Sequence, residues 1–342
     1  MASPPLVIPI FIPHSGCPHQ CAFCNQKAIT RETQSLPDPE RMAAVIRQYL
    51  QYKGGRTRVE LGFFGGNFLG LDPGHISRLL ADVQPFLDSG AIQGIRFSTR
   101  PDTVTENTLD LVRSYPVSLV ELGAQTMNDQ VLDRVNRGHT SDDTLRAMAL
   151  LEKHKLGAGI QVMVGLPGDA RSGMIRTADI LAKLRPLTAR IYPVLVLKKT
   201  LLAQWFKNGE YKPMALDQAV EISAEMVRVF TRAGVAVIRM GLQASGTTDP
   251  DVIAGPAHPA FGHLVLSHLM YSRVVEKIRG LGDDQAPGRV TLSVHPHVAS
   301  RLRGDKNSNL HRLKAVFPHL AFEIQTDPAM QSDQVDILKC PA

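Results

Sequence analysis

Three of the four cysteines in this 342-residue chain lie within the short segment CPHQCAFC. Cys17, Cys21 and Cys24 are spaced C-x3-C-x2-C. A structural zinc site needs four ligands, and His14 or His19 could supply the fourth, so zinc is one interpretation. Three thiolates also suit a [4Fe–4S] cluster that is bound through three irons, with the fourth iron left open for a substrate or cofactor.

The composition favours a reducing compartment for these thiols. Four cysteines in 342 residues, three of them clustered, do not make a disulfide framework. The N-terminal stretch MASPPLVIPIFIPH lacks the basic region and the small-residue cleavage site of a signal peptide. No stretch reaches the roughly 18 uninterrupted apolar residues of a membrane span. We therefore expect a cytoplasmic protein with no membrane partner.

The positive charge of the chain is mild. Lys plus Arg (38) against Asp plus Glu (32) gives a net charge of +6, which permits a nucleotide or RNA partner without requiring one. The segment RLRGDKNSNLHRLK, residues 301–314, has five basic residues against Asp305, a local net charge of +4. It could bind the phosphates of an RNA, or it could be an ordinary solvated surface.

Short apolar runs alternate with amphipathic segments along most of the chain. A branched and aromatic run from Val7 to Ile12 predicts the first strand. Further strands are expected at 59–64, 94–99, 117–122, 159–164 and 189–197. Helices are expected at roughly 39–52, 74–88, 104–114, 141–154, 172–185 and 216–233. This alternation predicts parallel strands that are joined by right-handed helical crossovers.

We expect an α/β fold in which residues 1–245 form a partial (β/α)6 TIM-like barrel. A barrel is favoured over a doubly wound sheet because polar and glycine motifs follow nearly every strand, and barrels build their sites from these loops. The segment GTTDPDVIAGPAHPA (246–260) marks a change of organisation. A small C-terminal α+β unit, 246–342, would follow as a lid or a substrate-binding region. Its Cys340 is expected to be an unligated thiol.

The cysteine loop resembles that of the radical S-adenosylmethionine (SAM) superfamily, in which C-x3-C-x2-C follows the first barrel strand. An aromatic residue precedes the last cysteine in that signature, and Phe23 takes this place. Gly65-Gly66-Asn67 follows the second strand, where the superfamily has a Gly-Gly-Glu-type motif. By themselves these glycines are equally compatible with a tight strand-to-helix turn.

Three longer strings point to one branch of that superfamily. They are FSTRPD (97–102), ELGAQTMNDQVLDRVNRGH (121–139) and GIQVMVGLPGD (159–169). They are most similar to the branch that contains the elongator catalytic subunit and the oxygen-independent coproporphyrinogen III oxidases. The similarity extends over about residues 5–245.

The resemblance implies a barrel of radical SAM type, with a [4Fe–4S] cluster on the three clustered cysteines and S-adenosyl-L-methionine as second cofactor. The residues that it implies at the SAM site are Phe23, Gly65, Gly66, Asn67, Ser98, Gln125, Arg137 and Gln161. Arg137 would meet the SAM carboxylate, and Ser98 and Gln161 would meet its ribose hydroxyls. Without the other motifs, a surface ion pair would be the favoured interpretation of Arg137.

The implied activity is reductive cleavage of SAM to a 5′-deoxyadenosyl radical, with an electron donor such as flavodoxin or ferredoxin. The catalytic residues that act on the substrate are unknown. Arg190, Tyr192, Arg239, Met240 and Gln243 could face the barrel mouth. Arg239 could hold an anionic group or pair with a neighbouring residue.

Two departures from the branch bear on the substrate. The 97 residues after residue 245 contain no recognisable acetyl-CoA-type glycine loop, so acetyl transfer is not expected. The first strand, within VIPIFIPHSGC, lacks the tyrosine of the porphyrinogen oxidases. The branch of the motifs and the basic segment 301–314 favour a radical SAM enzyme on tRNA or another nucleotide. The alternatives are a radical SAM enzyme on a small metabolite or tetrapyrrole, and a non-catalytic cluster or haem carrier.

Overall fold

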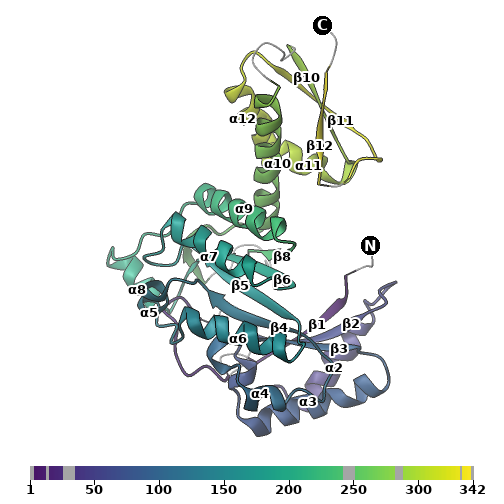
Figure 1. The fold of residues 1–342 in the computed structure, drawn as a ribbon, viewed down its shortest axis with the longest axis vertical. Helices are drawn as coiled ribbons and strands as arrows, with labels where there is room; N and C mark the ends of the chain where they lie inside the picture. The colour runs from purple at the N-terminus through teal and green to yellow at the C-terminus, as the bar shows by residue number, and fades with distance from the viewer. Residues whose placement is uncertain are drawn as a thin grey trace. The chain divides into compact units, whose positions relative to one another are not determined.

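The computed structural model describes residues 4–12, 15–25, 35–241, 251–281, 288–331 and 333–339. The chain divides into two compact units (Figure 1). The first comprises Met1–Ala215 and Met226–Ala257, and the second comprises Leu216–Glu225 and His258–Ala342. The expected boundary after residue 245 falls outside the described residues and stays a prediction.

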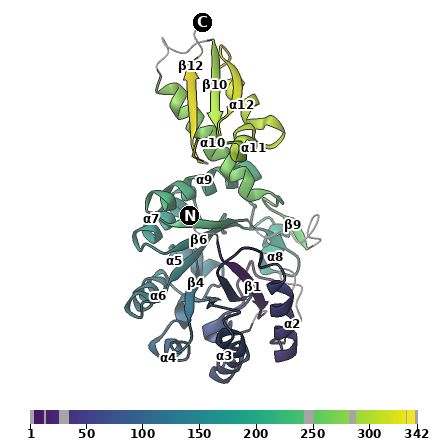
Figure 2. The same ribbon diagram turned by 90° about the vertical axis from the view of Figure 1, so that its right-hand side faces the viewer.

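Seven parallel strands form the sheet of the first unit. Their bounds are Leu6–Phe11 (β1), Val59–Phe64 (β2), Gly94–Thr99 (β3), Val117–Gln125 (β4), Ala158–Val164 (β5), Thr188–Pro193 (β6) and Ala236–Met240 (β8). The order is β1-β2-β3-β4-β5-β6-β8, and every neighbouring pair is parallel. The sheet curls into a half-barrel with helices around its outer side (Figure 2). The expected partial TIM-like barrel is confirmed, with one parallel strand beyond the six expected.

Most helices of this chain segment begin at a capping side chain. The helix bounds are Pro39–Leu50 (α2), Pro73–Asp88 (α3), Glu106–Asp110 (α4), Asp129–Arg134 (α5), Ser141–Lys153 (α6), Arg171–Lys183 (α7), Leu201–Lys207 (α8) and Leu216–Arg232 (α9). Helices α7 and α9 have alanine at the capping position instead. Asp38 accepts from the Arg41 N–H at 2.8 Å, and Asp72 accepts from the Gly74 N–H at 2.9 Å. In each case a proline follows the capping aspartate, where its missing N–H costs no helical hydrogen bond.

The elements differ from the expectation in several places, among them the helix Phe261–Arg279, which the sequence analysis does not predict. The expected strand at 189–197 is interrupted after Pro193, because proline cannot donate to a sheet ladder. The chain resumes as β7 (Val196–Leu197), which pairs antiparallel with β9 (Val252–Ala254). Helices α5 and α8 are missed by the sequence reading, because six or seven residues are too few to display a helical period.

An aromatic stack fixes which face of the sheet lies outward. Phe68, in a short 3-10 turn after β2, stacks between Phe63 of β2 and Phe97 of β3, with ring centroids 4.8 and 4.6 Å apart. All three rings are fully buried. Because side chains alternate along a strand, the residues next to Phe63 and Phe97, among them Arg96 and Ser98, face the inside of the half-barrel.

The second unit has its own sheet and core. Its elements are α10 (Phe261–Arg279), β10 (Arg289–Val294), α11 (Ala299–Arg303), α12 (Ser308–Val316), β11 (Ala321–Thr326) and β12 (Val335–Lys339). The strand order is β11-β10-β12, with β10 parallel to β11 and antiparallel to β12. Val274, Leu292, Leu302 and Leu313 are fully buried in one cluster. The expected α+β character of this unit is therefore confirmed.

Among the described residues, no helix has both the length and the apolar character that crossing a bilayer demands.

Candidate functional site

The cysteine loop follows β1 and is held by backbone hydrogen bonds from two other loops. The Ala22 N–H donates to the Val135 carbonyl at 2.9 Å, beyond β4. The Leu202 N–H, at the start of α8, donates to the Ala22 carbonyl at 2.8 Å. The Asn25 side chain donates to the Lys198 carbonyl at 2.7 Å. The loop is therefore positioned by the carboxyl-end loops of the half-barrel.

The three cysteines are free thiols. Cys21 is buried, whereas Cys17 and Cys24 are half-buried. His14 lies outside the described residues, and His19 is exposed and packs against Gly138. No three His, Cys, Asp or Glu side chains within the described ranges converge on one point as a single metal ion would need. A [4Fe–4S] cluster needs no such convergence, because each thiolate binds a different iron.

The turn after β2 brings its backbone against the cysteine loop. A Cβ at Gly66 would overlap the Ile12 carbonyl oxygen at the end of β1, so only glycine fits there without movement. Gly65 adopts a φ of 86°, in the left-handed region that favours glycine. Glycine is thus required by the packing of this turn against the end of β1, and the contact of this turn with SAM stays a prediction.

Asn67 joins three loops through its fully buried side chain. Its amide nitrogen donates to the Gly16 carbonyl at 2.7 Å, in the cysteine loop. Its amide oxygen accepts from the Thr99 and Thr103 hydroxyls at 2.7 and 2.9 Å and from the Arg100 N–H at 2.9 Å. The structure therefore gives Asn67 a structural role beside the cofactor contact that the sequence predicts for it.

Arg137 lies beside the cysteine loop and is only 7% exposed. One terminal nitrogen donates to the Gly123 carbonyl at 2.8 Å, and the other lies 3.4 Å from the Cys21 Sγ. Its Nε is buried with no hydrogen-bond partner among the described residues. The alternative of a surface ion pair is therefore wrong for Arg137, whereas its contact with a SAM carboxylate stays a prediction.

Two further basic residues at this place were missed by the sequence reading. Arg100, which is 2% exposed, donates to Asp102 at 2.9 and 3.0 Å, and its remaining terminal nitrogen is buried without a partner. His139 is 5% exposed, and neither ring nitrogen makes a well-aligned hydrogen bond within the described residues, although the Ala124 backbone is close. The signal was present, because both residues lie in the strings FSTRPD and NRGH.

The charges around the thiols act on each other. Burial lowers the pKa of His139 to about 3, and the guanidinium groups of Arg137 and Arg100 contribute in the same direction. Burial raises the pKa of the Cys17 thiol, while Arg137 and Arg100 oppose that change. Iron binding would deprotonate the thiol outright. The imidazole of His139 is therefore neutral at physiological pH.

These residues fit an anionic cofactor. Arg100 and Arg137 are buried cations, and each has a buried N–H that no described group accepts. Such groups are costly to bury unless an anion satisfies them. A cluster held by three thiolates and a ligand carboxylate are anions of this kind. The surroundings of the cysteine loop therefore suit a [4Fe–4S] cluster with SAM.

The remaining predicted SAM residues line the inside of the half-barrel or the loop itself. Gln161 of β5 donates to Gln125 at 3.3 Å, and Gln125 ends β4 with a φ of 65°. Ser98 of β3 is half-buried on the inner face. Phe23 packs against the apolar cluster that contains Val135. Gln125 and Gln161 are thus brought together, whereas Ser98 makes no recorded hydrogen bond to either.

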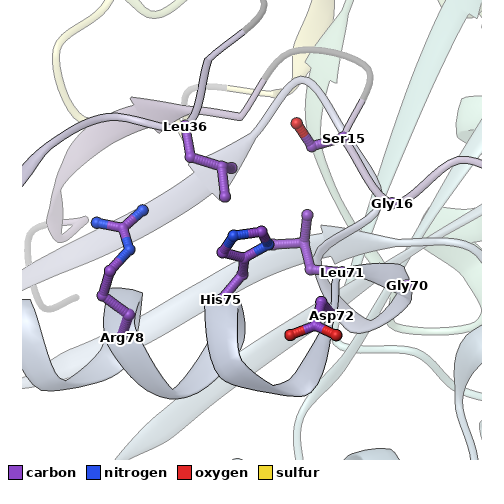
Figure 3. Close-up of a pocket in the computed structure, with 8 residues that line it drawn as sticks. All are labelled: Ser15, Gly16, Leu36, Gly70, Leu71, Asp72, His75 and Arg78. Atoms are coloured by element: carbon purple, nitrogen blue, oxygen red, sulfur yellow. The ribbon is translucent and has the colours of Figure 1, made fainter.

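A separate pocket opens next to the cysteine loop. Figure 3 shows His75 and Arg78 projecting from α3 toward Leu36, with Ser15 and Gly16 at the far side. Arg78 is already engaged, because it donates to the Pro37 carbonyl and to Asp82, each at 3.1 Å. None of the predicted cluster or SAM residues lines this pocket, and we assign it no function.

Two family models match this chain. The model of the radical SAM superfamily matches residues 11–181, which is half of the chain. The model of the radical SAM C-terminal domain matches residues 186–271. The first match contains the cysteine loop and the loops after β2, β3, β4 and β5.

Curated relatives are similar over part of their length. An uncharacterized protein of Methanocaldococcus jannaschii is 27% identical over 223 residues, which cover 62% of this chain and 68% of the relative. The tRNA uridine(34) acetyltransferase of Dehalococcoides mccartyi is 26% identical over 230 residues, which cover 58% of this chain. The matches span about half of that enzyme and of its counterpart from Methanocaldococcus jannaschii, 50% and 47%.

A solved structure shares the fold. The archaeal Elp3 of Methanocaldococcus infernus, with an N-terminal deletion, superposes with a TM-score of 0.63. It is 22% identical, and the match covers 82% of this chain and 64% of that protein.

Proposed function

Because the chain belongs to the radical SAM superfamily, we propose that it is a [4Fe–4S] enzyme that cleaves SAM reductively to a 5′-deoxyadenosyl radical and acts on a nucleotide, tRNA first. One observation carries this proposal. The three-thiol loop lies at the carboxyl ends of a parallel half-barrel, with the buried guanidinium of Arg137 3.4 Å from the Cys21 Sγ.

In this proposal the chain's own residues hold and orient the cofactors. Cys17, Cys21 and Cys24 would each bind one iron. Arg137 would donate to the Cys21 sulfur and stabilise its thiolate form, because hydrogen bonds between charged partners are stronger than neutral ones. The Gly65–Gly66 turn would admit the amino group of SAM to the backbone. The bound cluster and SAM together supply one-electron cleavage of a sulfonium carbon–sulfur bond.

Burial is the second contribution of the protein. Arg100, Gln125 and His139 are each at least nine-tenths buried around this place, so water has little access to it. Exclusion of water protects a reactive carbon radical from side reactions and strengthens the electrostatic contacts inside. Gln125 and Gln161 present amide groups of the type that hydrogen-bond hydroxyls, as proposed for the ribose.

Charge and the relatives of the chain support a tRNA substrate. Two relatives are tRNA uridine(34) acetyltransferases, and the chain carries a net charge of +6. In the second unit, Arg303, Lys306 and Lys314 are exposed, as phosphate contacts must be. Arg312 is exposed as well and lies 3.9 Å above the Tyr271 ring. We propose that this segment contacts an RNA backbone.

The proposal includes an electron donor and a compartment. A reductant such as flavodoxin or ferredoxin would deliver the electron to the cluster. The three thiols must be reduced to bind iron, which is the reason that we place the protein in the cytoplasm.

The test begins with protein that is reconstituted without oxygen and assayed for 5′-deoxyadenosine after addition of dithionite and SAM. We expect deoxyadenosine from the wild type and none from Cys21→Ala. Iron without deoxyadenosine would favour a non-catalytic carrier, and no iron at all would reopen the zinc interpretation. The tRNA of a strain that lacks this protein should then lose one modified nucleoside, whereas an unchanged nucleoside profile would count against tRNA as substrate.

A further inference from the structure

We propose that the inner face of the half-barrel carries an oxyanion-binding subsite, in which Arg190 and Arg239 hold a phosphate or carboxylate of the substrate. This inference rests on the proposed function, because it assigns the chemical class of the substrate for the same barrel. The argument starts from the charged side chains that line the inside of the sheet.

Four charged residues form a chain of ion pairs there. Arg96 of β3 donates through Nε to Glu60 of β2 at 2.7 Å. Arg190 of β6 donates to Glu121 of β4 at 2.6 Å, and Arg96 lies 3.8 Å from the same carboxylate. The side chains are between 3% and 15% exposed. The chain of pairs therefore extends across the sheet from β2 to β6.

Buried charges in the interior of a barrel lower the stability of the fold. Barrel interiors are normally filled by layers of branched apolar side chains. A buried ion pair loses its hydration, and an apolar replacement of similar volume is often as stable or more stable. A glycine leaves room for these charged side chains. A Cβ at Gly159 of β5 would lie 2.6 Å from the Thr188 hydroxyl and 3.5 Å from the Glu121 side chain. Charges that are kept at this cost are candidates for a role in binding.

Two guanidinium groups, those of Arg190 and Arg239, lie on neighbouring strands of this inner face. Arg239 of β8 pairs in register with Arg190, and it acts electrostatically on Glu121. An oxyanion between them would accept hydrogen bonds from the planar guanidinium groups.

Arg190 is held in one orientation with donor capacity remaining. Its guanidinium lies 5.2 Å from the centre of the Phe64 ring, and its other terminal nitrogen lies 3.5 Å from the Tyr192 hydroxyl. Its Nε is buried and makes no hydrogen bond to any described residue. The contacts with Glu121 and Phe64 preorganise the side chain, which reduces the entropy cost of binding a ligand.

The subsite lies next to the proposed SAM residues. Arg190 pairs in register with Gln161 of β5, and Gln161 donates to Gln125. A substrate whose phosphate or carboxylate is held by Arg190 would therefore place neighbouring carbon atoms near the proposed radical. Orientation of this kind accounts for a large share of enzymatic rate enhancement.

The test uses the full chain, reconstituted without oxygen, and isothermal titration calorimetry with two probes, inorganic phosphate and malonate. Arg190→Gln and Arg239→Gln should raise the Kd of the preferred probe about tenfold or more. Glu121→Gln should lower it about threefold, because it removes a carboxylate that competes for Arg190. Arg113→Gln is the matched control, since Arg113 is 71% exposed and pairs with Asp110.

The Kd is expected to rise in the arginine variants and to fall in Glu121→Gln, and these opposite changes make the result decisive. Tighter binding of phosphate assigns a phosphate-bearing substrate, and tighter binding of malonate assigns a carboxylate-bearing one. No binding to the wild type, an equal Kd in all variants, or a change of the same sign in Arg190→Gln and Glu121→Gln would overturn the subsite. Arg239 is half-buried, so Arg239→Gln carries the test if Arg190→Gln fails to fold.

Deoxyadenosine formation by the same wild-type preparation is measured separately. Its absence together with the expected Kd pattern would overturn the proposed function and leave the anion site standing. Deoxyadenosine formation together with an equal Kd in all variants would overturn the anion subsite and leave the proposed function standing.

Discussion

At the scale of single residues, the candidate site combines the three thiols with three buried basic side chains. Arg100, Arg137 and His139 come from the loops after β3 and β4 and are each more than nine-tenths buried. Two of them are charged, whereas burial lowers the pKa of His139 to about 3 and keeps it neutral. The neutral imidazole therefore adds hydrogen-bonding capacity without adding a third positive charge.

The pKa of His139 predicts how stability depends on pH. A histidine in the unfolded chain titrates near 6.5, whereas the pKa of His139 in the fold is lowered to about 3. Between these values the unfolded state binds more protons, so stability is present above about pH 6.5 and is lost as the pH falls below it. At pH 5 this group alone should cost about 2 kcal/mol of unfolding free energy.

Urea denaturation of the full chain at pH 7.5 and pH 5 measures this contribution. His139→Gln cannot titrate, so its unfolding free energy should fall less than that of the wild type between the two values. The exposed His75 on α3 provides the control, and His75→Gln should behave as the wild type does. Identical pH dependence in wild type and His139→Gln would contradict a neutral, buried imidazole.

At the scale of elements, the site depends on how tightly the loops at the carboxyl ends of the strands pack together. The cysteine loop is held by backbone hydrogen bonds to the segments near α5 and α8, and Asn67 links it to the loop after β3. Because these loops hold one another in place, a change in a neighbouring loop should also displace the thiols of the cysteine loop.

Gly66→Ala tests this coupling. The added methyl group would overlap the Ile12 carbonyl oxygen and push the turn after β2 away from the cysteine loop. We expect a loss of about 1–3 kcal/mol in unfolding free energy, as is typical of overpacking, and less iron bound per chain after reconstitution. Gly55→Ala is the control, because a Cβ at Gly55 has open space around it. Full iron loading of Gly66→Ala would show that the loops do not depend on this contact.

At the scale of the whole molecule, the chain has two units, each with its own core. The first unit carries the cysteine loop and the charged inner face of the half-barrel. The second carries the exposed basic residues of 301–314 beside a three-stranded sheet. If RNA is the substrate, chemistry and backbone binding are divided between the two units.

The salt dependence of tRNA binding tests whether the second unit contacts the RNA backbone. The double variant Arg303→Gln/Lys306→Gln removes two exposed cations that the proposal places on phosphates. The slope of log Kd against log salt for a tRNA transcript should then fall by about two, one for each lost phosphate contact. Binding can be followed by filter retention or anisotropy. Arg113→Gln in the first unit should leave the slope unchanged, and an unchanged slope in the double variant would remove this segment from the interface.

The sequence predicted the fold well wherever local periodicity was strong. Strands β2 and β3 lie at the expected residues, and α6 and α9 lie within one residue of their expected bounds. The helices α5 and α8 are too short to show such periodicity, and α10, which spans 19 residues, was not predicted either. His14, Gln243 and Cys340 lie outside the described residues, so the expectations for them stay predictions.

The sequence by itself determined that three thiols lie together in one loop, because the C-x3-C-x2-C spacing is a local property of eight residues. It also determined the alternation that leads to a half-barrel. Only the tertiary structure showed that Arg137 is buried beside Cys21, that Arg100 and His139 join it, and that Arg190 pairs with Glu121. The physical reason is that burial and charge pairing depend on strand register and loop packing, which bring together residues far apart in the chain.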